Sequence, residues 1–172
     1  MWFFPFVHRM YFKRSGVLFD EGSAGKENNK EQTNRPKDHP VQEVTMNFYK
    51  GANGELVEVI FPAEEMDIVI NGQPATKVEP GTSDGAHEKH VPAISKKDDV
   101  LEVQVGEVLH PMLDKHWITS IWAEYPDGTV VKKELNPGEE PVAAFDIKDV
   151  NGKMKIYEYC NLHGLWENEI DL

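Results

Sequence analysis

Val100-Leu101-Glu102-Val103-Gln104-Val105 alternates apolar and polar residues with the period of two that is typical of a strand with one buried face. Further runs of strand character follow it at Trp117–Tyr125, Thr129–Leu135, Val142–Ile147 and Met154–Tyr159. The later runs are separated by the turn signals Pro126-Asp127-Gly128, Asn136-Pro137-Gly138 and Asn151-Gly152. Short strands at this spacing, without a convincing helix, predict an all-β fold built as an antiparallel β-sandwich.

Composition divides the chain into three predicted parts. Residues 1–45 join a basic, aromatic opening to a stretch dominated by Gly, Asn, Lys, Glu and Pro, which predicts a disordered extension and linker. Residues 46–80 hold the strand candidates Leu56–Phe61 and Asp67–Ile70, with the turn dipeptide Asn71-Gly72 after the second. We expect so small a lobe to depend on the rest of the chain for stability. Residues 81–172 carry the predicted sandwich.

Bulk composition limits the classes of function. A net charge of −12 argues against binding to nucleic acid and to anionic membrane surfaces, which both require clustered Lys and Arg. No run approaches the roughly 18 apolar residues of a membrane span. Charged residues interrupt the short apolar opening, so that we do not expect it to act as a signal sequence. The single cysteine rules out an intrachain disulfide, so that nothing calls for an oxidising compartment. The expected location is the cytoplasm.

The cysteine lies in a stretch that looks suited to metal binding. Cys160 and His163 stand three residues apart, before a glycine that allows a sharp turn. His110 and His116 flank a loop whose backbone is restricted by a proline. His90 is expected to be carried on an extended segment, held out of a helix by the proline two residues later. Together they offer four imidazoles and one thiolate, a donor set that suits a redox-active transition metal.

Iron is the metal that best suits five such donors. Zinc prefers four ligands in a tetrahedron and would leave one donor unused. A blue-copper site is the main alternative, but it requires only two histidines and a cysteine, usually with a weakly bound methionine. Residues 164–172 contain no methionine, and two histidines would be left over. A non-enzymatic electron carrier on the same sandwich also remains open, while His8, His39 and His87 are expected to be ordinary surface residues.

Three motifs together resemble those of the superoxide reductases, most closely the desulfoferrodoxin and neelaredoxin type: Glu88-Lys89-His90-Val91-Pro92, His110-Pro111-Met112 with His116-Trp117-Ile118, and Cys160-Asn161-Leu162-His163-Gly164-Leu165-Trp166. The similarity covers about residues 46–172. It implies an immunoglobulin-like sandwich and reduction of superoxide to hydrogen peroxide at one non-haem iron. The resemblance makes His90, His110, His116 and His163 the equatorial ligands and Cys160 the axial one.

This chain differs from the two-iron members of the family in its N-terminal lobe. Members with two irons hold the second on four cysteines of a small N-terminal lobe, where this chain has Gly51, Asn53, Ile70 and Asn71. It is therefore similar to single-iron members that need an external electron donor, usually a rubredoxin. Lys89 is expected to attract superoxide, and Glu88 to reach the sixth position of ferric iron. A homo-oligomer, dimer or tetramer, is also expected.

Overall fold

The computed structural model describes residues 45–60, 66–81 and 86–172. The predicted extension over residues 1–45 lies outside this range except for its last residue. The described elements are β1 (Asn47–Lys50), β2 (Leu56–Val59), β3 (Val69–Ile70), β4 (Gln73–Pro74), β5 (Thr76–Val78), α1 (His87–His90), β6 (Pro92–Lys97), β7 (Val100–Val105), β8 (Ile118–Glu124), β9 (Val130–Glu134), β10 (Val142–Asp146), β11 (Lys153–Cys160) and β12 (Gly164–Asp171). Nothing in the described ranges is a helix with the length and apolar character needed to cross a bilayer.

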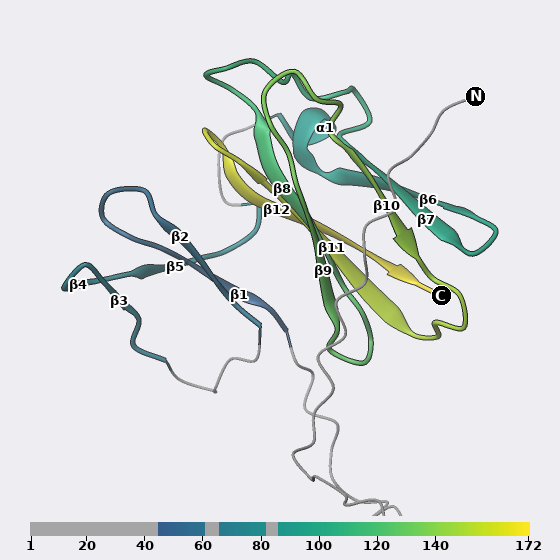
Figure 1. Cartoon of the computed structure of the whole chain (residues 1–172), viewed down its shortest axis with the longest axis horizontal. Helices are drawn as coiled ribbons and strands as arrows, with labels where there is room; N and C mark the ends of the chain where they lie inside the picture. The colour runs from purple at the N-terminus through teal and green to yellow at the C-terminus, as the bar shows by residue number, and fades with distance from the viewer. Residues whose placement is uncertain (1–44, 61–65, 82–85) are drawn as a thin grey trace, which may run out of the picture. The chain divides into compact units, whose positions relative to one another are not determined.

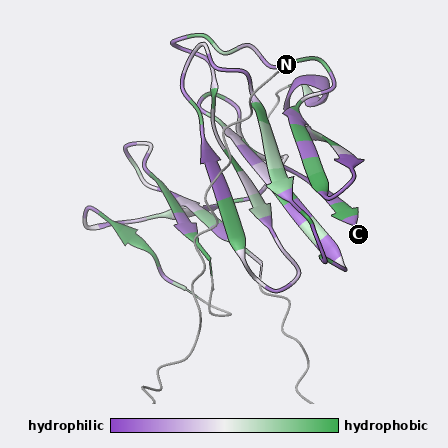
Figure 2. Ribbon diagram, turned by 45° about the vertical axis from the view of Figure 1, so that its right-hand side comes forward, coloured by the Kyte–Doolittle hydropathy of each residue, from purple (hydrophilic) through white to green (hydrophobic). Residues whose placement is uncertain are grey.

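The prediction of an antiparallel β-sandwich is confirmed. One sheet has the order β10-β7-β6, and the facing sheet has the order β12-β11-β8-β9 (Figure 1). Hydrophobic and hydrophilic residues alternate along several of these strands (Figure 2), so that each sheet turns an apolar face toward the other. The buried core between them includes Leu101, Val103 and Val105 from β7, as the alternation predicts, packed with Ile118 and Ile156 of the facing sheet.

Both faces of the four-stranded sheet are covered, because the N-terminal lobe packs against its outer side. Phe48 of β1 meets the Trp122 ring edge-on, with 5.1 Å between ring centroids, and also lies against Tyr157. An ion pair of 2.7 Å joins Lys132 of β9 to Glu58 of β2. Double coverage explains why β8 and β11 are buried almost continuously instead of in alternation.

The lobe holds its two turns together without cysteine. Its sheet has the order β2-β1-β5, and β3 and β4 form a hairpin in which Asn71 and Gly72 both have positive φ, as their sequence predicts. The Glu55 carboxylate accepts hydrogen bonds from the backbone N–H and the side-chain amide of Asn53, and from the amide of Asn71 at 2.7 Å. A carboxylate thus bridges positions at which the resemblance places metal-binding cysteines.

One sequence prediction about the ligand segments is wrong. His90 does not lie on an extended segment but ends the single helical turn of α1. Pro92 restricts the residue directly before it, and Val91 is indeed not helical, with φ −57° and ψ 121°. Residues 87–90 escape that restriction, and the backbone N–H of Val91 closes the turn on the carbonyl of His87 at 3.0 Å.

Candidate metal centre

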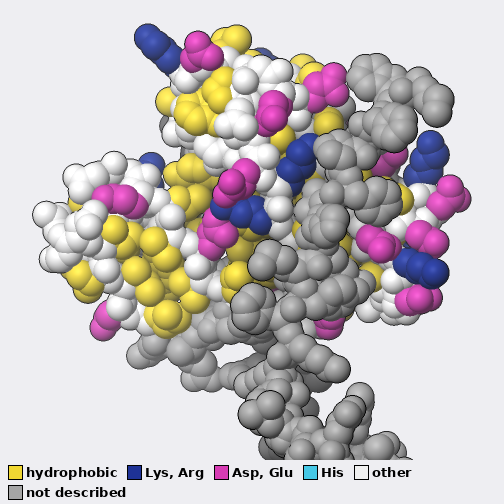
Figure 3. All heavy atoms as spheres, in the orientation of Figure 1, with side chains coloured by type: hydrophobic (Ala, Val, Ile, Leu, Met, Phe, Trp, Pro, Cys, Tyr) yellow, Lys and Arg dark blue, Asp and Glu magenta, His cyan; other side chains and the backbone are white. Residues whose placement is uncertain are grey.

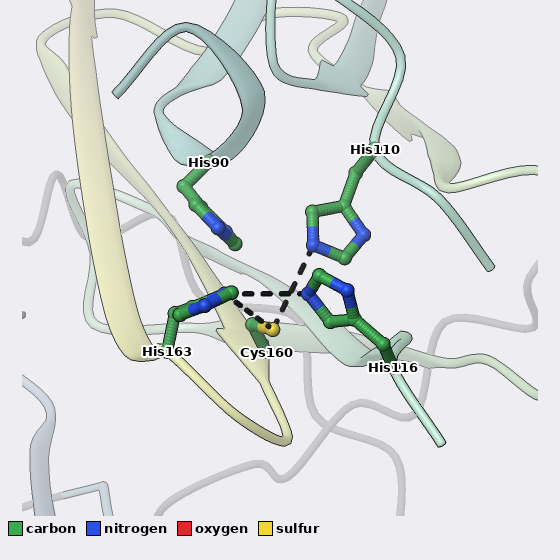
Figure 4. A group of neighbouring side chains, drawn as sticks. All are labelled: His90, His110, His116, Cys160 and His163. Atoms are coloured by element: carbon green, nitrogen blue, oxygen red, sulfur yellow. Dashed lines mark hydrogen bonds between the residues drawn. The ribbon is translucent and has the colours of Figure 1, made fainter. Parts of the chain in front are cut away.

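Five donor side chains from three separate segments meet at one end of the sandwich, between its sheets. His90 comes from α1, His110 and His116 from the connection between β7 and β8, and Cys160 and His163 from the turn between β11 and β12. Each offers one ligand atom, and these atoms all lie within 4.8 Å of one another (Figure 4). The structure therefore brings together all five of the residues that the sequence suggests as ligands.

The β11–β12 turn directs Cys160 and His163 inward. Cys160 pairs with Gly164 across the hairpin, and Gly164 has a φ of +78°, a conformation that a side chain would disfavour. The pairing of β11 with β8 shifts register between Tyr159 and Cys160, an irregularity of the kind that re-aims a side chain beside a functional site. Cys160 is fully buried in the core between the sheets.

Asn161 joins this turn to the loop that carries His116. Its side-chain oxygen accepts a hydrogen bond from the backbone N–H of Trp117, and its amide donates to the carbonyl of Lys115, both at 3.0 Å. Its own backbone N–H donates to the carbonyl of Trp117 at 3.2 Å. One side chain between Cys160 and His163 thus fixes the separation of two ligand-bearing loops.

Gly106 joins the remaining loop to α1. Its backbone N–H donates to the carbonyl of Val91, and the N–H of Val108 donates to the carbonyl of Glu88 at 2.9 Å. A Cβ on Gly106 would lie 2.6 Å from the Lys89 Cα and from the Val108 carbonyl oxygen, and its φ is +79°. Only glycine allows the two segments that carry His90 and His110 to approach so closely.

Distances between the donor atoms are slightly longer than those expected of ligands around a single ion. His116 Nε2 lies 3.2 Å from His163 Nδ1, which is 3.5 Å from the Cys160 sulfur, and that sulfur is 3.6 Å from His110 Nε2. Ligands at right angles, with bonds of about 2.1 Å to nitrogen and about 2.3 Å to sulfur, would stand roughly 3.0–3.1 Å apart. A slight contraction would complete such a site, so the residues present fit a metal ion.

Burial favours the neutral, metal-binding form of the imidazoles of His90, His110 and His116. It is the first cause that lowers the pKa of His90, to about 3, and the pKa of His110, to about 4. The charges of neighbouring histidines and of Lys89 lower both further, and burial likewise lowers the pKa of His116. Near neutral pH the lone pairs of these rings are therefore available to a cation.

The thiol of Cys160 has a mixed environment. Burial raises its pKa, while hydrogen bonds from the backbone N–H groups of His163 and Leu162 oppose the rise by favouring the thiolate. A bound cation would add a much stronger preference for the thiolate. The same two N–H groups would then moderate the electron density that the sulfur gives to the metal.

Glu158 is a residue of this site that the sequence analysis missed. It is completely buried, one of its oxygens lies 3.3 Å from His90 Nδ1, and its Oε2 has no hydrogen-bond partner among the described residues. Burial raises the pKa of this carboxyl well above its ordinary value. The contact occupies Nδ1 of His90, so that Nε2 is the ring nitrogen left to bind a metal. In many metal sites a carboxylate orients a histidine ligand in this way.

Trp166 further fixes the orientation of His90. The two rings stack with 13° between their planes and 5.1 Å between centroids. The His87 ring meets the Trp166 ring edge-on, with 4.8 Å between centroids. His87 is not one of the five donor residues. The sequence expectation that His87 stays outside the set agrees with this placement.

Lys89 and Glu88 lie on the exposed side of α1. The positive charge of Lys89 acts on three of the histidines, since it contributes to the lowered pKa of His90, His110 and His116. Glu88 is not among the five donors that converge.

Comparison with known proteins gives consistent matches. The family model described as Desulfoferrodoxin matches residues 82–169. A desulfoferrodoxin of Nitratidesulfovibrio vulgaris is 49% identical over 117 residues, which cover 67% of this chain and 89% of that protein. A superoxide reductase of Thermococcus kodakarensis is 38% identical over 108 residues, 53% of this chain and 93% of that one. The crystal structure of the superoxide reductase from Treponema pallidum superposes with a TM-score of 0.57 at 29% identity, covering 72% of this chain and 98% of that structure.

Proposed function

This chain belongs to the desulfoferrodoxin family, and from that premise we propose that it is a superoxide reductase that converts superoxide to hydrogen peroxide. One observation carries the proposal: four imidazoles and one thiolate converge within 4.8 Å. The similarity to superoxide reductases of Thermococcus kodakarensis and Treponema pallidum supports the same activity. The reaction consumes one electron and two protons for each superoxide.

We propose that His90, His110, His116, His163 and Cys160 together would hold one iron ion. Five donors suit iron better than zinc, which prefers four. Iron bound there would supply the electron that superoxide accepts, with the thiolate favouring its release. Glu158 and Trp166 hold the His90 ring in place, and Asn161 keeps the two ligand loops at a constant separation.

Lys89 is proposed to draw superoxide to the site. The chain carries a net charge of −12, so that an anion needs a local positive charge to approach. Lys89 is exposed and directly precedes His90. At about 6 Å and an effective dielectric near 20, its attraction for a unit anion is on the order of 3 kcal/mol before screening. Glu88 is proposed as a further ligand that would approach the iron only in its ferric state.

The electron is proposed to come from a separate protein, with a rubredoxin as the candidate. The chain has one cysteine, so that its lobe has no four-cysteine site for a second iron. A cytoplasmic location and a dimeric or tetrameric assembly also remain proposals, made from the sequence and its resemblance.

Two measurements test the proposed function. The purified protein, loaded with iron, is expected to carry about one ion per chain and, once reduced, to consume superoxide rapidly while forming hydrogen peroxide. Rapid mixing with superoxide, followed by peroxide assay, checks both points. A reduced iron protein that does not react with superoxide would refute the enzymatic role and favour a simple electron carrier. Copper binding with intense colour in the isolated protein would favour the blue-copper alternative.

A further inference from the structure

Met112 connects the loop that carries two of the five donor residues to the core of the sandwich. It stands two residues after His110 and four residues before His116. Its sulfur accepts a hydrogen bond of 3.3 Å from the backbone N–H of Ile118, the first residue of β8. Its carbonyl accepts another, of 2.7 Å, from the backbone N–H of Gly138. The thioether is therefore one of the contacts that set the position of this loop.

The same side chain packs beside the predicted thiolate ligand. Ile118 is the partner of Cys160 in the pairing of β8 with β11, and both residues belong to the buried core against which Met112 packs. Leu113, the residue after Met112, exchanges backbone hydrogen bonds of 2.9 Å with His116. A change in the Met112 side chain therefore acts on the neighbours of two predicted ligands.

Met112 is more open to solvent than the methionines of the core. It is half-buried, whereas Met46 and Met154 are 3% and 0% exposed. Met66, the remaining methionine of the described residues, is also half-buried but belongs to the N-terminal lobe. Hydrophobic side chains reach the surface at the end of the sandwich where the ligand-bearing loops lie (Figure 3). An uncharged oxidant such as hydrogen peroxide is not repelled there by the net charge of −12.

We propose that Met112 is a reversible oxidation site, at which hydrogen peroxide formed by the protein converts the thioether to a sulfoxide and so weakens the iron site. This inference rests on the proposed superoxide reductase activity, which supplies the peroxide. A lone pair of the sulfur forms a bond to one peroxide oxygen, the O–O bond breaks, and the second oxygen leaves as water with both protons. Sulfur is oxidised by two electrons and the peroxide is reduced by two, so that no further reactant is needed.

The sulfur of Cys160 is a poorer target than that of Met112. Cys160 is 0% exposed, and a metal ion bound to it would occupy a lone pair of its sulfur. The Met112 thioether is half-buried, is not one of the five donors and has no proton to lose, so that it reacts in the form in which it is present. Its sulfoxide is also reduced back by methionine sulfoxide reductases, unlike the higher oxidation states of cysteine.

Oxidation changes the size and the polarity of a side chain in a packed position. The added oxygen is polar and needs space, while the core against which Met112 packs is apolar. A sulfur that turns away from the core loses its contact with the N–H of Ile118. Either change displaces the loop of His116, and we expect the affinity for iron to fall roughly tenfold. Accumulated peroxide thus lowers the activity that produces it.

The test exposes the ferric, iron-loaded protein to a small excess of hydrogen peroxide. Peptide mass spectrometry measures the fraction of each methionine that gains one oxygen, and competition with a chelator measures the affinity for iron. Met112 should be oxidised about tenfold faster than Met154. The affinity should fall roughly tenfold and return after treatment with methionine sulfoxide reductases. Met112→Leu, which conserves the side-chain volume, is the matched control and should keep its affinity through the same treatment.

Oxidation of Met66 ahead of Met112, or oxidation of Met112 that leaves the affinity for iron unchanged, would overturn the proposal. An equal loss of affinity in Met112→Leu would do so as well, since the damage would then lie at Cys160. Circular dichroism checks that the variant is folded; if it is not, the wild-type measurements still separate the first two outcomes from the expected one. Because the peroxide is added, a protein that behaves as expected here but ignores superoxide would refute the proposed function and leave Met112 supported as a peroxide-sensitive site.

Discussion

His110→Gln is expected to make the metal-free protein less sensitive to acid. His110 is buried, and burial with the neighbouring imidazoles lowers its pKa from 6.5 to about 4. In the unfolded chain the ring takes up a proton below about pH 6.5, while in the folded chain it stays neutral down to about pH 4. Between these values the unfolded state binds more protons, and the folded state loses stability as the pH falls.

The magnitude follows from the width of this window. One histidine contributes about 1.4 kcal/mol of lost stability per pH unit. Between pH 6.5 and pH 4.5 the penalty from His110 reaches about 2–3 kcal/mol. Glutamine at this position does not titrate, so the variant escapes the penalty. Other buried groups of the site, such as His90 and Glu158, titrate in both proteins and largely cancel in the comparison.

Urea unfolding of both proteins, in the presence of a chelator, measures the effect. The free energy of unfolding of wild type minus that of His110→Gln should fall by about 2–3 kcal/mol between pH 7.5 and pH 4.5. A difference that stays constant over this range would refute the reasoning. It would mean that the ring titrates as in water and is not packed among the other donors.

Four other substitutions test separate parts of the site. Lys89→Ala should slow the reaction with superoxide roughly tenfold and flatten its salt dependence in rapid-mixing measurements, whereas the control Lys97→Ala on β6 should change neither. Cys160→Ser should remove the thiolate-to-iron charge-transfer band from the visible spectrum, and survival of the band would assign it to another ligand. Glu158→Leu should weaken iron binding roughly 10–100-fold in competition with a chelator, and unchanged affinity would exclude its orienting role. Gly106→Ala should lower stability to urea by about 2 kcal/mol or more, because its Cβ meets backbone 2.6 Å away; equal stability would contradict the close approach.

The sequence predicts the strands that show a hydrophobic pattern within their own residues. β7 to β11 have clear alternation or apolar runs between turn signals, and the structure contains all five of them. β6 and β12 were missed because Pro92 opens the first and Gly164 the second, and both end in exposed residues. Their position in the sheets comes from pairing with β7 and β11, which a sequence pattern does not show.

The five donor residues were recognisable from residue type and spacing, but their supporting residues were not. Glu158 stands in a run of strand residues, Tyr157 to Cys160, that is buried throughout. A charged residue between two aromatic residues of a predicted strand is the feature of the sequence from which Glu158 could have been identified. Asn161 acts through backbone groups on a loop more than 40 positions away. Only the fold reveals such a contact.

X-ray absorption at the iron edge of the loaded protein is the measurement that tests the site most directly. The account predicts one sulfur neighbour at about 2.3–2.4 Å and about four nitrogen neighbours near 2.1 Å. Cys160→Ser should lose the sulfur contribution alone. An iron shell made only of nitrogen and oxygen in the wild-type protein would contradict the convergence of the four imidazoles and the thiolate on one ion.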